Sequence, residues 1–142
     1  MSLDEIQEEI IAEFANLGDW MEKYNYLIEL SKELKPLDVK FKTSDNLING
    51  CQSRVWLVAE ICDDNLIFLA DSDAIITRGI IALLVKVLSG RKPEEIMKAD
   101  LYFIDQIGLR QNLSPTRSNG LLSMVKQMKM YGLAYFSKMN SN

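Results

Sequence analysis

The spacing of apolar residues changes twice along this chain. Apolar side chains recur every three or four residues up to about residue 34, follow a period of two between residues 53 and 70, and return to helical spacing from residue 74. One short alternating region between two helical regions is typical of a small antiparallel sheet packed against helices. Because Val39, Phe41 and Thr43 also alternate, we predict an α+β fold with a three-stranded antiparallel sheet.

Capping residues and helix breakers predict where the helices begin and end. Ser2 with Glu5 has capping-box spacing, and Asp73 is the predicted N-cap of the helix that follows the sheet. Ser114 as N-cap and Pro115 at the first helical position open the last long helix. The predicted helices run from Ser2 to Gly18, from Asp19 to Pro36, from Asp73 to Gly90, from Pro93, from Leu101 to Gln106 and from Ser114 onward, and the strands cover 39–43, 53–61 and 66–70.

Length and composition exclude several classes of protein. The 142 residues suit a single domain covering 1–142. The chain has no histidine and two cysteines, so it lacks the imidazole base of a Cys-His or Ser-His-Asp hydrolase and the ligands of a structural zinc site. A net charge of −4 differs from the basic excess of nucleic-acid binders. With no signal-peptide pattern and no apolar run near ~18 residues, we expect a cytoplasmic protein with no bound metal, no nucleic-acid partner and no membrane partner.

Charge is distributed unevenly between the two ends of the chain. Residues 1–22 contain acids but no bases, whereas residues 117–142 contain bases but no acids. These charges either form two solvated helix faces or guide the approach of a charged protein partner.

Cys51 is the strongest candidate for chemistry. It follows Asn49 and Gly50, a pair that tolerates left-handed backbone and predicts a sharp turn before a strand. A reactive thiol needs access and nearby positive charge, which Arg54 offers three residues later. The alternative is that Cys51 is a small apolar residue packed at the start of the strand.

Cys62 and the segment Leu113–Leu121 have less specific patterns. Cys62 ends the predicted strand and precedes two acids, whose charges oppose formation of a thiolate, so a structural role is favoured. The Leu113–Leu121 segment places Arg117 in the first turn of a capped helix, where backbone N–H groups favour an anion. The alternative for this segment is a capped helix without further function, in which Arg117 only pairs with an acid such as Asp73.

Several segments together resemble the SufE-type sulfur acceptors. Leu47–Trp56, with the sequence LINGCQSRVW, is similar to the active-site segment of that family. Ala70–Ala74, Thr77–Ile80 and Leu113–Leu121 match further family segments in the same order, so the resemblance covers nearly the whole chain. One departure is Asn49, where family members often carry proline, and asparagine leaves the loop more mobile.

The resemblance implies a fold like that of iron–sulfur scaffold proteins and a role in sulfur transfer. It implies that Cys51 takes a persulfide sulfur from a cysteine desulfurase, stimulates that enzyme, and delivers sulfur to an iron–sulfur scaffold complex. The supporting residues are then Gly50, Gln52, Arg54, Asp73 and Arg117. No cofactor is implied, because the pyridoxal phosphate belongs to the desulfurase, and the chain is an accessory protein rather than a stand-alone enzyme.

Other functions stay open at this point. Sulfur delivery to a tRNA-modifying or sulfur-activating enzyme involves the same residues. An iron–sulfur scaffold has a similar fold but needs about three cysteine ligands. A non-catalytic interaction domain would leave Cys51 without a role.

Overall fold

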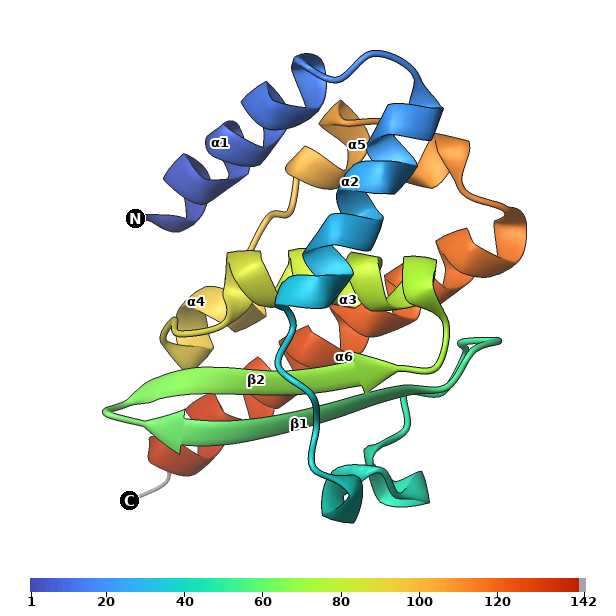
Figure 1. Cartoon of the computed structure of the whole chain (residues 1–142). Helices are drawn as coiled ribbons and strands as arrows, with labels where there is room; N and C mark the ends of the chain where they lie inside the picture. The colour runs from blue at the N-terminus through green and yellow to red at the C-terminus, as the bar shows by residue number, and fades with distance from the viewer. Residues whose placement is uncertain (141–142) are drawn as a thin grey trace.

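A computed structural model describes residues 1–140 of the chain (Figure 1). Within these residues no helix combines the length and apolarity needed to cross a bilayer. The elements in chain order are α1 (Leu3–Ala15), α2 (Trp20–Glu33), the 3-10 turns η1 (Val39–Phe41) and η2 (Ser44–Asn46), β1 (Val55–Cys62), β2 (Asn65–Ser72), α3 (Ile75–Leu88), α4 (Pro93–Lys98), α5 (Phe103–Gln106), the 3-10 turn η3 (Arg110–Asn112) and α6 (Pro115–Met139).

Helix α3 forms the centre of the hydrophobic core. Its residues Ile80, Leu83, Leu84 and Leu88 are fully buried, because α2 packs on one side and β2 and α6 pack on others (Figure 1). Gly79 allows the close approach of α2, since a Cβ there would collide with the backbone of Leu27. The predicted α+β architecture is therefore confirmed, with helices on both sides of the hairpin in the sequence.

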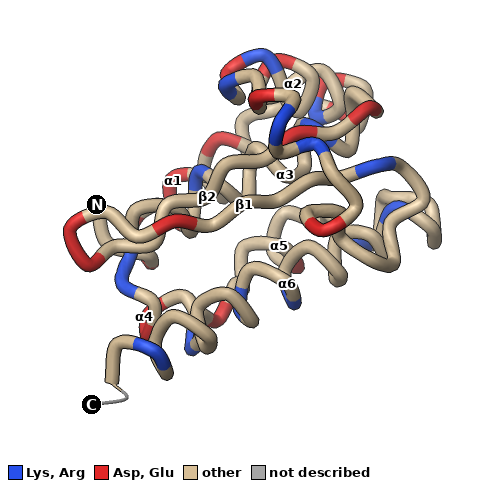
Figure 2. Tube along the Cα trace, turned by 90° about the horizontal axis from the view of Figure 1, so that it is seen from below, with Lys and Arg blue, Asp and Glu red and all other residues tan. Residues whose placement is uncertain are grey.

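Strands β1 and β2 form a two-stranded antiparallel hairpin. Their register runs from the pair Val55–Ser72 to the pair Cys62–Asn65. Asp63 and Asp64 form the turn with φ of 51° and 66°, the left-handed geometry that matches the twist of a tight hairpin. Seen from below, acids mark this turn, whereas α6 carries only basic charges (Figure 2).

The predicted third strand is wrong. The segment 39–43 contains the 3-10 turn η1 instead, in which the Asp38 carboxylate accepts a hydrogen bond from the Lys40 N–H at 3.1 Å. Val39 is 78% exposed, so its alternation with Phe41 and Thr43 does not correspond to a core-facing side of a strand. At the outer edge of β1, Leu47 forms an isolated antiparallel bridge with Trp56.

Candidate functional site: the Cys51 pocket

The loop that carries Cys51 is shaped by Gly50. Its φ is +92°, as the Asn-Gly pattern predicts for a sharp turn. The same glycine lies directly against α6, because a Cβ at this position would collide with the hydroxyl of Ser123. Two features therefore favour glycine at position 50: the positive φ of its backbone and the close packing of the loop on α6.

The sulfur of Cys51 rests against the backbone of α6. Its thiol donates a hydrogen bond to the Gly120 carbonyl at 3.6 Å. A Cβ on Gly120 would lie 3.5 Å from this sulfur, an ordinary van der Waals contact, so the loop is close to the helix at this point. The thiol is half-buried, and this burial raises the pKa of Cys51 above its ordinary value. In this arrangement the neutral thiol is favoured over the thiolate.

Asp73 holds the other end of the loop. Its carboxylate accepts a hydrogen bond from the Arg54 N–H at 3.0 Å, and its own N–H donates to the Arg54 carbonyl at 3.2 Å. The predicted N-cap role of Asp73 is wrong, because Ala74 is the N-cap and its N–H is bound by the Ser72 hydroxyl at 3.3 Å. Asp73 instead joins the start of β1 to the segment that enters α3.

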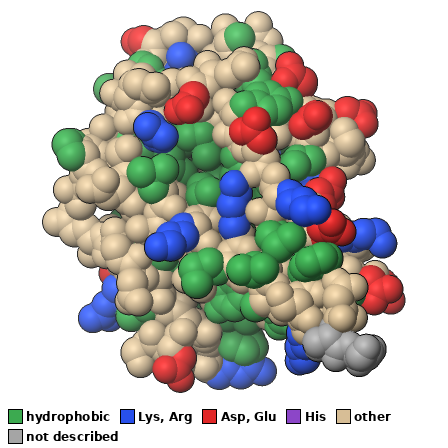
Figure 3. Space-filling view, turned by 180° about the vertical axis from the view of Figure 1, so that it is seen from behind, with side chains coloured by type: hydrophobic (Ala, Val, Ile, Leu, Met, Phe, Trp, Pro, Cys, Tyr) green, Lys and Arg blue, Asp and Glu red, His purple; other side chains and the backbone are tan. Residues whose placement is uncertain are grey.

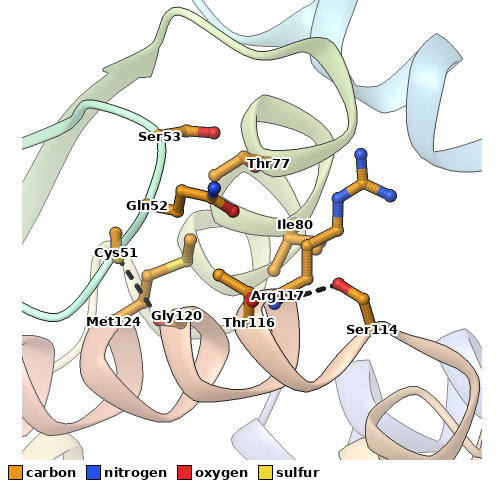
Figure 4. Close-up of a pocket in the computed structure, with 10 residues that line it drawn as sticks. All are labelled: Cys51, Gln52, Ser53, Thr77, Ile80, Ser114, Thr116, Arg117, Gly120 and Met124. Carbon is orange, nitrogen blue, oxygen red and sulfur yellow. Dashed lines mark hydrogen bonds between the residues drawn. The ribbon is translucent and has the colours of Figure 1, made fainter.

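A pocket of about 340 Å³ opens beside Cys51 (Figure 4). The loop, α3 and α6 each supply part of its wall, so residues far apart in sequence meet here. Its lining consists of Cys51, Gln52, Ser53, Thr77, Ile80, Ser114, Thr116, Arg117, Gly120 and Met124. Three segments matched by sequence resemblance thus converge on one cavity.

Only some of the predicted supporting residues line this pocket. Gln52 and Arg117 line it together with Cys51, whereas Arg54 does not. The guanidinium of Arg117 points away from Cys51 in Figure 4. Within residues 1–140 it forms no ion pair with Asp73, so the simpler prediction that these two residues pair is wrong. Burial alone raises the pKa of Cys51, with no contribution from a cation.

The helix end predicted to favour an anion is present but offset from the sulfur. Ser114 caps α6 as predicted, and its hydroxyl accepts from the Arg117 N–H at 3.3 Å. Cys51 contacts Gly120, more than one turn further along the helix, where it meets a carbonyl oxygen instead of free N–H groups. The resting thiol therefore receives no help in ionising from the N-terminus of α6.

Sequence reasoning assigned no role to two residues of the site, although both lie in segments that resemble the family. Thr77, in the matched segment Thr77–Ile80, is a buried threonine of α3 that lines the pocket. Asp71 is a buried acid that pairs with Lys42 at 3.2 Å and with Arg78 at 3.3 Å. This cluster joins the segment before the Cys51 loop to the hairpin and to α3, and thereby supports both ends of the site.

Neither cysteine belongs to a metal site in the described part of the chain. Within residues 1–140 no three His, Cys, Asp or Glu side chains gather closely enough to hold a metal ion. Cys62 is exposed at the end of β1, beside the hairpin turn, so it does not pack as the structural residue that was predicted.

Comparison with known proteins identifies the family of this chain. Residues 8–132 match the SufE model, described as an Fe-S metabolism associated domain. The chain is 43% identical over 127 residues to SufE-like protein 1, chloroplastic/mitochondrial, of Arabidopsis thaliana, covering 89% of this chain and 34% of that protein. It therefore spans about a third of the length of this relative.

Two further comparisons cover most of both chains. An uncharacterized SufE-like protein of Rhizobium meliloti (strain 1021) is 40% identical over 127 residues, covering 86% of this chain and 91% of that one. The solution structure of a hypothetical protein from Thermus thermophilus has a TM-score of 0.76 at 16% identity, with 93% and 96% of the two chains covered, and so shares the fold. The chain belongs to the SufE family of domains associated with Fe-S metabolism.

Proposed function

We propose that this protein accepts a sulfur atom on Cys51 from the persulfide of a cysteine desulfurase and carries it toward iron–sulfur cluster assembly. The observation that carries the proposal is the position of Cys51. Its sulfur lies on a loop at the edge of a polar pocket, in a chain that belongs to a family associated with Fe-S metabolism. We keep the cytoplasm as the expected compartment.

The transfer is a thiol–persulfide exchange. The Cys51 thiolate attacks the outer sulfur of the desulfurase persulfide, a new S–S bond forms at Cys51, and the S–S bond of the donor breaks. The desulfurase cysteine leaves as a thiolate, so the sulfur atoms and electrons balance without an oxidant or a reductant. The step needs no histidine, provided that Cys51 is a thiolate when the donor arrives.

The resting geometry implies that the desulfurase also has to change the surroundings of Cys51. Burial and the Gly120 carbonyl both favour the neutral thiol of Cys51. A desulfurase that draws the loop away from α6 removes both effects and thereby favours the reactive thiolate. On this proposal sulfur acceptance depends on the partner, and Cys51 has low reactivity between encounters.

Exposed apolar and basic side chains on the surface suit a protein partner. Leu122 on α6 is 45% exposed, and Ile75 at the start of α3 is 54% exposed. The face opposite to the view of Figure 1 also gathers apolar side chains with Lys and Arg among them (Figure 3). Exposed apolar groups of this kind, bordered by charge, are typical of interaction surfaces.

The scaffold alternative fits the chain less well. Cluster ligation needs about three cysteine thiolates, and the sequence has two cysteines. Delivery of sulfur to a tRNA-modifying or sulfur-activating enzyme is the alternative within sulfur transfer, and it uses the same Cys51 chemistry.

The test is to incubate the protein with its cognate desulfurase and cysteine and to follow intact mass and peptide mass. Wild type should gain the mass of one sulfur on Cys51, and Cys51→Ser should lose both this gain and the stimulation of desulfurase turnover. Arg117→Ala should reduce the rate of gain while leaving alkylation of Cys51 in the free protein unchanged, because the guanidinium points away from the resting sulfur. Full stimulation by folded Cys51→Ser would contradict the transfer mechanism.

A further inference from the structure

Thr77 is a largely buried residue whose hydroxyl has no protein partner. The residue is 6% exposed, and within residues 1–140 its hydroxyl forms no hydrogen bond and keeps some exposure to the pocket. Figure 4 shows the side chain projecting from α3 into the pocket that also contains Cys51. A hydroxyl that has no protein partner and is accessible from the pocket is available to donate a hydrogen bond to a group held there.

The two chemical states of Cys51 need opposite partners. The resting thiol is a donor, and the Gly120 carbonyl accepts its hydrogen bond at 3.6 Å. A persulfide loses its proton more readily than a thiol, and the resulting anion accepts hydrogen bonds but donates none. The Gly120 carbonyl that suits the thiol repels this anion, so the outer sulfur requires a donor elsewhere in the pocket.

The pocket has both the room and the donor. One added sulfur extends the side chain by an S–S bond of about 2.05 Å, which a cavity of about 340 Å³ accommodates easily. Ile80 and Met124 give the pocket an apolar part, where a hydrogen bond to an anion is stronger than in water. The Thr77 hydroxyl opens into this space and has no competing acceptor.

We propose that Thr77 donates a hydrogen bond to the outer sulfur of the Cys51 persulfide and holds the loaded side chain in the pocket. This inference rests on the proposed function, and it assigns a residue to the stage between sulfur acceptance and sulfur delivery. Gly120 holds the empty thiol and Thr77 holds the loaded persulfide. Retention in the pocket slows loss of the outer sulfur to small thiols and to oxidants.

The variants Thr77→Val and Thr77→Ser separate the hydroxyl from the shape of the side chain. Without sulfur, Thr77→Val should melt at or slightly above the wild-type temperature, because the resting structure gives the hydroxyl no partner. After loading, the Thr77→Val persulfide should lose its outer sulfur to dithiothreitol about tenfold faster than wild type, consistent with a hydrogen bond to a charged group. Thr77→Ser, which keeps the hydroxyl, should restore most of the persulfide lifetime.

Two loading methods make the results distinguishable. Each variant is loaded once by desulfurase with cysteine and once by sodium polysulfide, and the Cys51 peptide is followed by mass. If the desulfurase fails to load any variant, the proposed function fails, and the polysulfide-loaded proteins still test Thr77. Thr43→Val is the matched control, because Thr43 is exposed, lies outside the pocket and provides no side-chain cap. Equal persulfide lifetimes in wild type and Thr77→Val, or a lower melting temperature of sulfur-free Thr77→Val, would overturn the inference.

Discussion

Cys51 and Cys62 carry the same thiol in opposite surroundings. Cys51 lies just before β1, half-buried against α6 and hydrogen-bonded to the Gly120 carbonyl. Cys62 ends β1 and is exposed beside a turn made by two acids in left-handed backbone. The more accessible thiol therefore lies outside the Cys51 pocket, and the thiol that we propose to react is the one that is partly shielded.

This difference shows that exposure alone is a poor guide to a sulfur-carrying cysteine. A persulfide oxidises easily, so a carrier benefits from a site that is closed between encounters. The Cys51 site is closed by three contacts that Cys62 lacks: the Gly50 turn on α6, the Asp73 hydrogen bonds to Arg54, and the contact with Gly120. Removing these contacts one at a time should make Cys51 behave more like Cys62.

Gly50→Ala should have the largest effect of this kind. Its φ of +92° is unfavourable for alanine, and left-handed backbone at a residue with a side chain costs about 1–2 kcal/mol. A Cβ there also collides with the Ser123 hydroxyl. We expect unfolding free energy to fall by about 1–3 kcal/mol, and alkylation of Cys51 at constant pH to become faster because the loop leaves α6.

The double variant Gly50→Ala/Ser123→Ala is the control for this prediction. It removes the collision but keeps the unfavourable φ, so it should recover only part of the lost stability. Cys62 provides an internal reference, because its alkylation rate should be the same in all of these proteins. An unchanged alkylation rate of Cys51 in Gly50→Ala would show that the turn does not close the site.

The parts of the site that follow from local chemistry could be predicted from sequence. The Gly50 turn and the Ser114 cap each depend on residues next to one another, and both are confirmed. Thr77 and Gly120 become part of the site only through the packing of α3, α6 and the loop, and no local pattern reports that packing.

The errors have the same physical origin. The alternation of Val39, Phe41 and Thr43 is too short to fix a strand, and the Asp38 side chain stabilises a 3-10 turn there instead. Asp73 has the residue type of an N-cap, but its carboxylate finds the Arg54 N–H across the loop. In both cases a side-chain hydrogen bond decided between conformations that the sequence pattern alone could not separate.

Asp73→Ala should have an intermediate effect. It leaves the Arg54 N–H without the carboxylate acceptor at 3.0 Å, and the loss of one such hydrogen bond at an exposed position lowers unfolding free energy by about 0.5–1.5 kcal/mol. Alkylation of Cys51 should become faster, but less so than in Gly50→Ala. Asp73→Asn keeps an acceptor oxygen and should stay close to wild type. Equal alkylation rates in the alanine and asparagine variants would show that this hydrogen bond does not restrain the loop.

Cys62→Ser should have the smallest effect and gives the sharpest form of the comparison. Because Cys62 is exposed, its loss should change unfolding free energy by no more than about 0.5 kcal/mol and leave sulfur acceptance at the wild-type level. Cys51 is then the remaining thiol. Burial raises the pKa of Cys51, so its thiolate fraction falls sooner as the pH is lowered, and its alkylation midpoint should lie above the ordinary cysteine range. Alkylation of Cys62 alone, measured in Cys51→Ser, should be faster at neutral pH. A large loss of sulfur acceptance in folded Cys62→Ser would instead indicate a relay between the two cysteines.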